Sequence, residues 1–216
     1  MTETEWLGCA DPTSMVRHLQ RFRSSDRKFR LFAAACCRRI AHRLPDDRCR
    51  EALDTSERYL EGLAGSDELA AAYVNAQRAF TEFDNRDGWE TAASAVSSAC
   101  VADEVPFFAA SAAREAALLV WPRLQRKMEY RWQSRVLHDI FGNPFRSVVI
   151  VPTWITTDVC ILAEGIYAEK AFDRMPILAD ALQDAGCDND DILNHCRQPG
   201  EHVRGCWVVD LLLGKT

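Results

Sequence analysis

Three cysteines and a histidine near the C-terminus have the residue types and the spacing of a metal site. Cys187, Cys196, His202 and Cys206 follow the pattern C-x8-C-x5-H-x3-C, and His195 lies beside the second cysteine. Thiolates and imidazoles are the ligands that zinc prefers, and four of them can close a tetrahedral structural site. The intervals are similar to those of small CCCH zinc fingers, with the last two ligand types exchanged. The pattern therefore predicts zinc as one interpretation.

The same cysteines have a second interpretation as packing residues. Cys187 directly follows Gly186, a residue type that often ends helices, and Cys206 is next to Trp207. A free cysteine behaves as a small hydrophobic side chain when it is buried. Because the surrounding segments carry enough apolar residues to pack without a metal, we expect packing and no cofactor here, with bound zinc as the alternative.

Two further pairs of residues could take part in chemistry. Cys36 and Cys37 precede two arginines, whose charge would lower the pKa of a thiol, but Cys36 lies on an apolar stripe and is expected to be buried. His138 and Asp139 could form an acid–base site, but they end a predicted helix just before Gly142, which favours a structural stop. The sequence has no serine elbow, P-loop, dinucleotide-binding glycine pattern or HExxH motif. It therefore predicts no catalytic residue and favours a non-catalytic helical interaction or adaptor module. The alternative is a small zinc-binding protein that uses the C-terminal cluster for recognition, including that of nucleic acid, or for catalysis.

Charge is unevenly distributed along the chain. Residues 17–50 carry eleven Lys or Arg and three acidic residues, whereas residues 158–191 carry nine acidic and two basic residues. The net charge of −6 argues against a protein whose whole surface follows a nucleic acid. Contact between basic and acidic surfaces explains the same charges, so we expect a protein partner or self-association in preference to nucleic acid. The predicted basic interaction face consists of Arg27, Arg30, Arg38, Arg39 and Arg43.

The elements that must position these residues are predicted to be helices. Thr2 and Glu5 predict a capping box, and Asp11 before Pro12 predicts an N-cap. From Phe29 to Leu44, apolar residues recur at the helical period. The predicted helices cover residues 26–44, 46–61, 67–83, 89–102, 106–141 with a jog at Pro122, 158–171, 173–185, 188–197 and 203–213, and a turn is predicted at residues 85–88.

The predicted fold class is all-α, a multi-helix bundle with a smaller C-terminal helical unit. The one extended stretch, residues 147–152, is β-branched but too short to build a sheet by itself. We expect an N-terminal helical body over residues 1–142, a connecting segment over 143–153 and a C-terminal unit over 154–216. A single continuous domain is the alternative.

Length and composition are those of an ordinary globular chain, with 216 residues, 48% hydrophobic and 27% charged. The nine cysteines cannot all pair in disulfides, because their number is odd. The N-terminus lacks the basic start and the apolar run of a secretory signal. The most apolar long window, residues 99–121, contains four charged residues and a proline, which argues against a membrane span. We therefore expect a cytoplasmic protein with no membrane partner.

Four long strings of the sequence resemble one family of bacterial proteins that is abundant in planctomycete-type genomes. They are DRKFRLFAAACCRR (26–39), LHDIFGNPFR (137–146), AFDRMPILADALQDAGC (171–187) and HCRQPGEHVRGCWVVDLLLGK (195–215). Members of the family begin with a similar MTE-x-EWL segment. The resemblance implies a cytoplasmic bacterial protein, and it brings no activity, ligand or catalytic residue to this chain.

Overall fold

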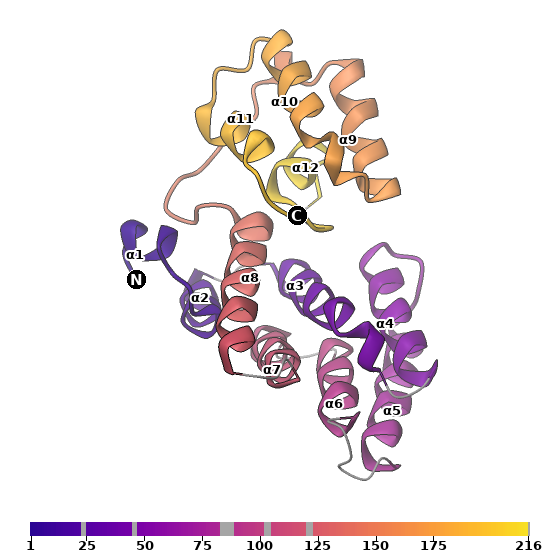
Figure 1. Cartoon of the computed structure of the whole chain (residues 1–216). Coiled ribbons are helices and arrows are strands. Elements are labelled where there is room, and N and C mark those ends of the chain that lie inside the picture. Colours follow the sequence, from indigo (N-terminus) through magenta and orange to yellow (C-terminus); the bar gives the residue numbers. More distant parts are fainter. Residues whose placement is uncertain (23–24, 45–46, 83–88, 102–104, 120–122, 216) are drawn as a thin grey trace. The chain divides into compact units, whose positions relative to one another are not determined.

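The computed structural model describes residues 1–22, 25–44, 47–82, 89–101, 105–119 and 123–215. These residues form helices and no strands, which confirms the predicted all-α fold. The chain divides into two compact units, Met1–Leu137 (unit 1) and His138–Thr216 (unit 2), whose elements are labelled in Figure 1. The turn predicted at residues 85–88 and the jog predicted at Pro122 lie outside the described residues.

Capping residues start the first two helices of unit 1. At α1 (Glu3–Leu7), the backbone N–H of Glu5 donates to the Thr2 hydroxyl at 3.2 Å, and the backbone N–H of Thr2 donates to the Glu5 carboxylate at 2.7 Å. At α2 (Pro12–Leu19), the side chain of Asp11 accepts a backbone N–H and proline occupies the first turn. Both predicted caps are confirmed, because each satisfies N–H groups that have no partner within the helix.

Six longer helices form the rest of unit 1. They are α3 (Asp26–Arg39), α4 (Asp47–Leu60), α5 (Ser66–Glu82), α6 (Trp89–Ala99), α7 (Val105–Leu118) and α8 (Arg123–Phe141), with 3₁₀ turns at Gln20–Phe22 and Ala41–Arg43. Helices α4, α5, α6 and α7 pack in succession, and α3 packs against α4, α6 and α7. Buried alanines on α6 and α7 allow these helices to approach closely. The predicted helix over residues 106–141 is two helices, α7 and α8.

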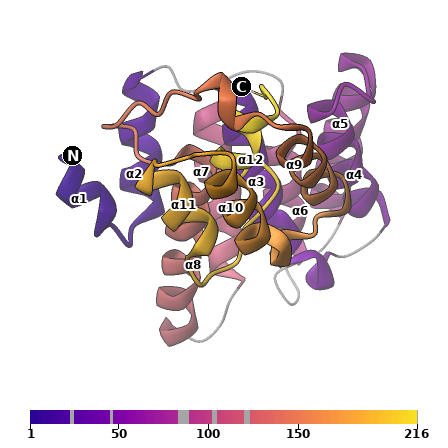
Figure 2. The ribbon, with the colours of Figure 1, turned by 90° about the horizontal axis from the view of Figure 1, so that it is seen from above.

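Unit 2 contains the last turn of α8 and four further helices. These are α9 (Thr157–Glu169), α10 (Met175–Asp184), α11 (Asp190–Arg197) and α12 (Trp207–Leu212), with 3₁₀ turns at Pro152–Trp154 and Phe172–Arg174. Helix α10 packs against α9 and α11, and α12 packs against α9 and α11 (Figure 2). Their shared core includes Trp154, Val159, Ile166, Met175, Leu178, Leu182, Ile192, Val208 and Val209.

The last helix of unit 2 begins later in the chain than predicted. Helix α12 begins at Trp207 rather than near residue 203, because residues 198–206 form a loop in which Gly205 has φ +94°. Such a φ ends a helical path and is accessible to glycine without strain. No helix among the residues described here is both long and apolar enough to cross a membrane.

Candidate metal centre

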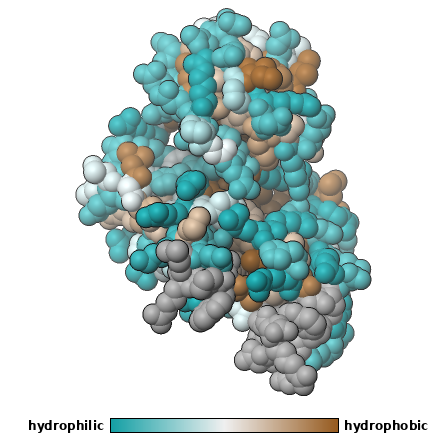
Figure 3. Space-filling model, in the orientation of Figure 1, coloured by the Kyte–Doolittle hydropathy of each residue, from teal (hydrophilic) through white to brown (hydrophobic). Residues whose placement is uncertain are grey.

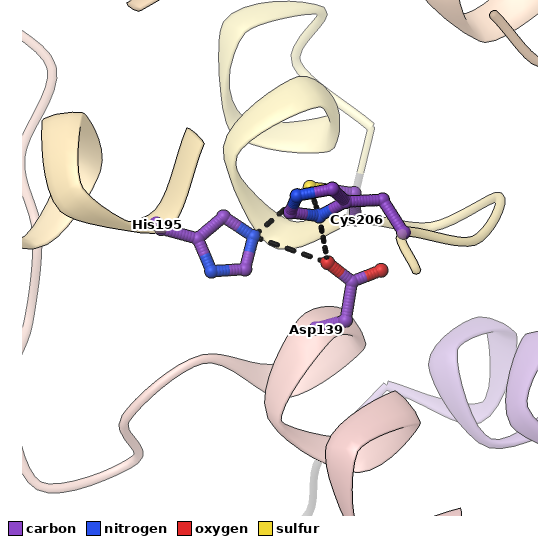
Figure 4. Close-up of side chains that lie close together, drawn as sticks. Asp139, His195 and Cys206 are labelled. Carbon is purple, nitrogen blue, oxygen red and sulfur yellow. Dashed lines mark hydrogen bonds and ion pairs between the residues drawn. The ribbon is translucent and has the colours of Figure 1, made fainter. Parts of the chain in front are cut away.

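Four side chains that could bind a metal converge inside unit 2. They are Asp139, His195, His202 and Cys206, whose candidate ligand atoms all lie within 4.8 Å of one another. Figure 4 shows Asp139 and His195 pointing toward one another from α8 and α11, with Cys206 close to both. Each of the four residues is at most 9% exposed to solvent.

Asp139 lies in the last turn of α8, where the helix stops at a glycine. Gly142 has φ +64°, and its backbone N–H donates to the His138 carbonyl at 2.9 Å, which closes the helix end. A Cβ atom at this position would lie 3.2 Å from Cγ of Trp207, the first residue of α12. The bare glycine backbone therefore lets α12 approach the end of α8 and places Cys206 near Asp139.

His195 occupies the buried stripe of α11. The helix starts at the N-cap Asn189, whose side chain accepts the backbone N–H of Ile192 at 3.1 Å. Ile192, His195 and Cys196 follow at three- and four-residue intervals, so all three face the interior. The His195 ring lies 5.2 Å from the Trp207 ring and 5.0 Å from the His202 ring, measured between centroids. The helix period thus points the imidazole inward.

The loop between α11 and α12 supplies His202 and ends at Cys206. The backbone N–H of Val203 donates to Asp139 Oδ2 at 2.8 Å, which fixes the carboxylate from the loop side. The backbone N–H of Cys206 donates to the Val203 carbonyl at 3.0 Å in a turn through Gly205. These two bonds hold the loop so that His202 and Cys206 lie beside the same carboxylate.

The contacts centre on one carboxylate oxygen and one imidazole nitrogen. Asp139 Oδ1 lies 2.6 Å from His202 Nδ1 and 3.1 Å from His195 Nε2. His195 Nε2 also lies 3.2 Å from Cys206 Sγ, and Cys206 Sγ is 3.9 Å from His202 Nδ1. Ligands at 2.0–2.3 Å from a tetrahedral zinc ion lie about 3.3–3.6 Å from one another. Shifts of these side chains by about an ångström would therefore bring the donor atoms to the mutual distances found around a tetrahedral zinc ion.

The arrangement does not fit a cysteine–histidine–aspartate catalytic triad. In a triad the nucleophile contacts one imidazole nitrogen and the carboxylate contacts the other. Here Asp139 Oδ1 and Cys206 Sγ both contact Nε2 of His195, while Nδ1 lies 3.1 Å from Nε2 of Gln198. The side chains converge on a point between them, which is the geometry of ligands and not of a proton relay.

Electrostatics keep Asp139 charged and Cys206 neutral in the absence of a cation. Burial acts to raise the pKa of Asp139, but hydrogen bonds and charge from His195 and His202 outweigh it and lower the pKa overall. Burial, with the negative charge of Asp139 next in importance, raises the pKa of the Cys206 thiol well above its usual value. A divalent cation would reverse the balance at Cys206, because it stabilises the thiolate.

The cluster shares two residues with the predicted zinc set. His202 and Cys206 are in it, whereas Cys187 and Cys196 pack in the apolar core of unit 2, with exposures of 3% and 1%. Burial raises the pKa of both thiols, for Cys196 to about 12. The group of converging ligand atoms among the described residues therefore does not include these two cysteines.

Asp139 and His195 are missing from the ligand set that the sequence spacing predicts. His195 could have been found from the α11 period, because it lies on the same stripe as Ile192. Asp139 carried a weaker signal, namely an acidic residue in the last turn of a helix, where the helix dipole disfavours negative charge. No local spacing connects Asp139 to the C-terminal loop.

The predicted basic interaction face is wrong at Arg30. This side chain is 6% exposed, donates to the Val101 carbonyl at 2.6 Å and lies over the Tyr59 ring. Arg38 bonds Asp54 and Glu57, and Arg39 bonds Glu129 at 2.7 Å. Of the five predicted residues, helix packing buries one in the core and brings two others into hydrogen bonds with carboxylates. The five are Arg27, Arg30, Arg38, Arg39 and Arg43.

The thiols of Cys36 and Cys37 do not form a reactive pair. Both side chains are fully buried, and the Cys37 thiol donates to the Ala95 carbonyl at 3.4 Å. Burial raises the pKa of each thiol well above its usual value and outweighs the arginine charges. A neutral, buried thiol is a poor nucleophile, so these residues are part of the packing of unit 1.

Comparisons of the chain with protein-family models, with curated proteins and with solved structures gave no match.

Proposed function

We propose that unit 2 binds one zinc ion through Asp139, His195, His202 and Cys206, and that the ion has a structural role. The observation that carries the proposal is the convergence of four donor atoms within 4.8 Å, with His195 Nε2 in contact with both Asp139 Oδ1 and Cys206 Sγ. Imidazole and thiolate ligands in tetrahedral geometry favour zinc among the common metal ions.

Charge balance also supports zinc at this buried position. The Asp139 carboxylate and the Cys206 thiolate carry two negative charges, and two neutral imidazoles complete the set, so a divalent ion gives a neutral centre. An uncompensated charge is costly to bury, whereas a neutral cluster is not. Cys206 releases its proton when the metal binds, because the thiolate is the ligand.

A structural role follows from the number and the burial of the ligands. Catalytic zinc sites keep one coordination position for water or substrate, and structural sites are closed by four protein ligands. Here four protein side chains are available and all are buried. We therefore propose a non-catalytic protein whose second unit is stabilised by zinc.

The test is metal analysis of protein purified without a histidine tag, in the wild type and in three serine variants. We expect one equivalent of zinc in the wild type, its loss in Cys206→Ser, and its retention in Cys187→Ser and Cys196→Ser. The controls matter because all three cysteines are buried, so a general effect of a buried hydroxyl would appear in all of them. Zinc that depends on Cys187 or Cys196, or a wild type that does not bind added zinc, would overturn the proposal.

We also propose, as a second function, association with another protein chain through unit 2. Figure 3 shows apolar side chains gathered on part of the surface of this unit. Ile161 on α9 and Ile177 on α10 are 61% and 54% exposed, and the two helices pack against each other. Exposed aliphatic residues on adjacent helices support an association surface.

Sedimentation velocity over a range of protein concentrations tests self-association. We expect the double substitution Ile161→Ser with Ile177→Ser to abolish it. A wild type that stays monomeric would exclude self-association as the mode.

A further inference from the structure

Gln198, the C-cap residue of α11, contacts the metal cluster from its outer side. Its side-chain nitrogen lies 3.1 Å from Nδ1 of His195, the ring nitrogen that faces away from Asp139 and Cys206. The residue itself is exposed at the start of the loop that leads to His202. Gln198 is therefore placed to act on His195 without touching a bound metal.

The position of the proton on His195 decides which partner Nδ1 needs. A carboxylate only accepts hydrogen bonds, so in the metal-free protein the Nε2–H of His195 donates to Asp139 Oδ1 at 3.1 Å. Nδ1 then carries a lone pair and accepts a hydrogen bond from the amide NH₂ of Gln198 at 3.1 Å. When a metal occupies Nε2, the proton must be on Nδ1, and Nδ1–H needs an acceptor.

A glutamine side chain can satisfy both states. A half-turn of the amide exchanges its NH₂ group for its oxygen, so the same residue donates to the lone pair or accepts from Nδ1–H. A glutamate would serve only the metal-bound form, because it only accepts, and a leucine would serve neither form.

Asp139 supports the metal-free state in a complementary way. Its carboxylate accepts from His195, from His202 at 2.6 Å and from the Val203 backbone at 2.8 Å. The ligands therefore stay together by hydrogen bonds when the ion is absent. Both states of the site then have complete hydrogen bonding around His195.

We infer that Gln198 is a positioning residue for His195 that sets how tightly unit 2 holds its structural zinc ion and how fast the ion exchanges. The inference rests on the proposed zinc site and adds to it a role for Gln198 in setting affinity and exchange. A site built for permanent occupancy would favour a carboxylate at this position, since carboxylates are common partners of zinc-bound histidines.

The test compares zinc affinity in the wild type, Gln198→Glu, Gln198→Leu and the control Asn194→Leu, an exposed amide on the same helix. Competition with a chromogenic chelator gives the dissociation constant, and transfer of zinc to excess chelator gives the release rate. Since the loss of such partners weakens metal binding about 10- to 100-fold, we expect Gln198→Leu to bind about 10-fold more weakly. Gln198→Glu should bind more tightly and release zinc more slowly, and Asn194→Leu should match the wild type.

Nitrogen NMR of the His195 ring provides a readout that a merely structural role would not change. In the metal-free wild type we expect the Nε2–H tautomer, and in metal-free Gln198→Glu an added proton on Nδ1, because a carboxylate on each side of the ring only accepts hydrogen bonds. If both Gln198 variants bind zinc with the same affinity as the wild type, the role of Gln198 is overturned and the zinc site stands. A wild type that binds no zinc overturns both.

Discussion

Unit 1 and unit 2 place their buried polar side chains differently. Unit 1 has five cysteines, and two of its buried thiols donate to separate backbone carbonyls, Cys37 to Ala95 and Cys100 to Ala52. Unit 2 has four cysteines, yet only Cys206 joins a group of converging donors among the residues described. The comparison shows that the number of cysteines does not locate a metal site. A metal site is located by the convergence of lone pairs from different elements.

The strongest expected contrast is that metal removal should destabilise unit 2 alone. A ligand present at 1,000 times its dissociation constant stabilises the folded state by about 4 kcal/mol, and unit 2 keeps its own apolar core when zinc is absent. Chelation should therefore lower the melting temperature without unfolding the unit. Hydrogen exchange should accelerate in α11 and α12 and stay unchanged in α5 and α6; equal acceleration in both units would contradict a local site.

The second prediction concerns an ion pair of unit 1 with one buried partner, Glu129, and one partly exposed partner, Arg39, whose side chain is 41% exposed. Glu129 is 2% exposed and accepts from Arg39 Nε at 2.7 Å and from Gln133 at 3.2 Å. Arg39→Met leaves this carboxylate without its cation and should lower the free energy of unfolding by about 2 kcal/mol in urea titrations, less than for a fully buried pair because solvent reaches Arg39. Arg39→Met with Glu129→Gln should recover most of the loss.

The matched control for this pair is Arg58→Met, which breaks an exposed pair with Glu68. Both of its side chains are about half exposed, at 50% and 53%. Exposed pairs contribute about 0–1 kcal/mol, so the control should be nearly neutral. Equal losses in Arg39→Met and Arg58→Met would show that burial of Glu129 does not matter.

A third, smaller effect is expected at the contact between Gly142 and Trp207. Gly142→Ala forces a side chain into a backbone with φ +64° and puts a Cβ 3.2 Å from the indole. Gly186→Ala has φ +87° with nothing within 4 Å, so it isolates the backbone contribution. We expect about 1 kcal/mol for Gly186→Ala and about 2 kcal/mol for Gly142→Ala, with weaker zinc binding in the latter only. Unfolding curves measure the stability of each variant, and chelator competition measures its zinc binding. Equal effects of the two substitutions would show that the close approach of Gly142 to Trp207 does not matter.

The smallest effect is a pH-dependent one at Glu115 in α7. Its Oε2 is buried without a hydrogen-bond partner among the described residues, and burial raises the pKa of the carboxyl, with Ser94 and Arg114 opposing. An acid whose pKa is raised by folding contributes stability that is complete below its unfolded pKa and is lost as the pH rises through the folded pKa.

Glu115→Gln should therefore stabilise unit 1 at pH 7 by about 1 kcal/mol, because it replaces a buried charge with a neutral polar group. Near pH 4 the gain should vanish, since the native carboxyl is then protonated. Urea unfolding at both pH values gives the comparison, with Glu51→Gln on the exposed side of α4 as the control. A gain of the same size at pH 4 would contradict the assignment.

Much of the helical structure could be predicted from local signals. The Thr2–Glu5 capping box, the Asp11–Pro12 start and the stop at Gly142 act within a few residues, so their effect does not depend on distant parts of the chain. The prediction was wrong where a tertiary contact competes with propensity. Residues 203–206 read as helix but form a loop, in which Val203 gives its N–H to Asp139.

Local patterns are sufficient to predict that the C-terminal region is helical and rich in side chains that bind zinc, and the predicted ligand set already includes His202 and Cys206. Which of these side chains meet depends on tertiary packing. The packing of α10 and α11 encloses Cys187, in the connection between them, and Cys196, on α11, within the apolar core. Asp139 reaches the cluster because α8 stops at Gly142 under α12. Spacing along a chain fixes the direction of a side chain relative to its own helix, whereas convergence depends on how the helices pack.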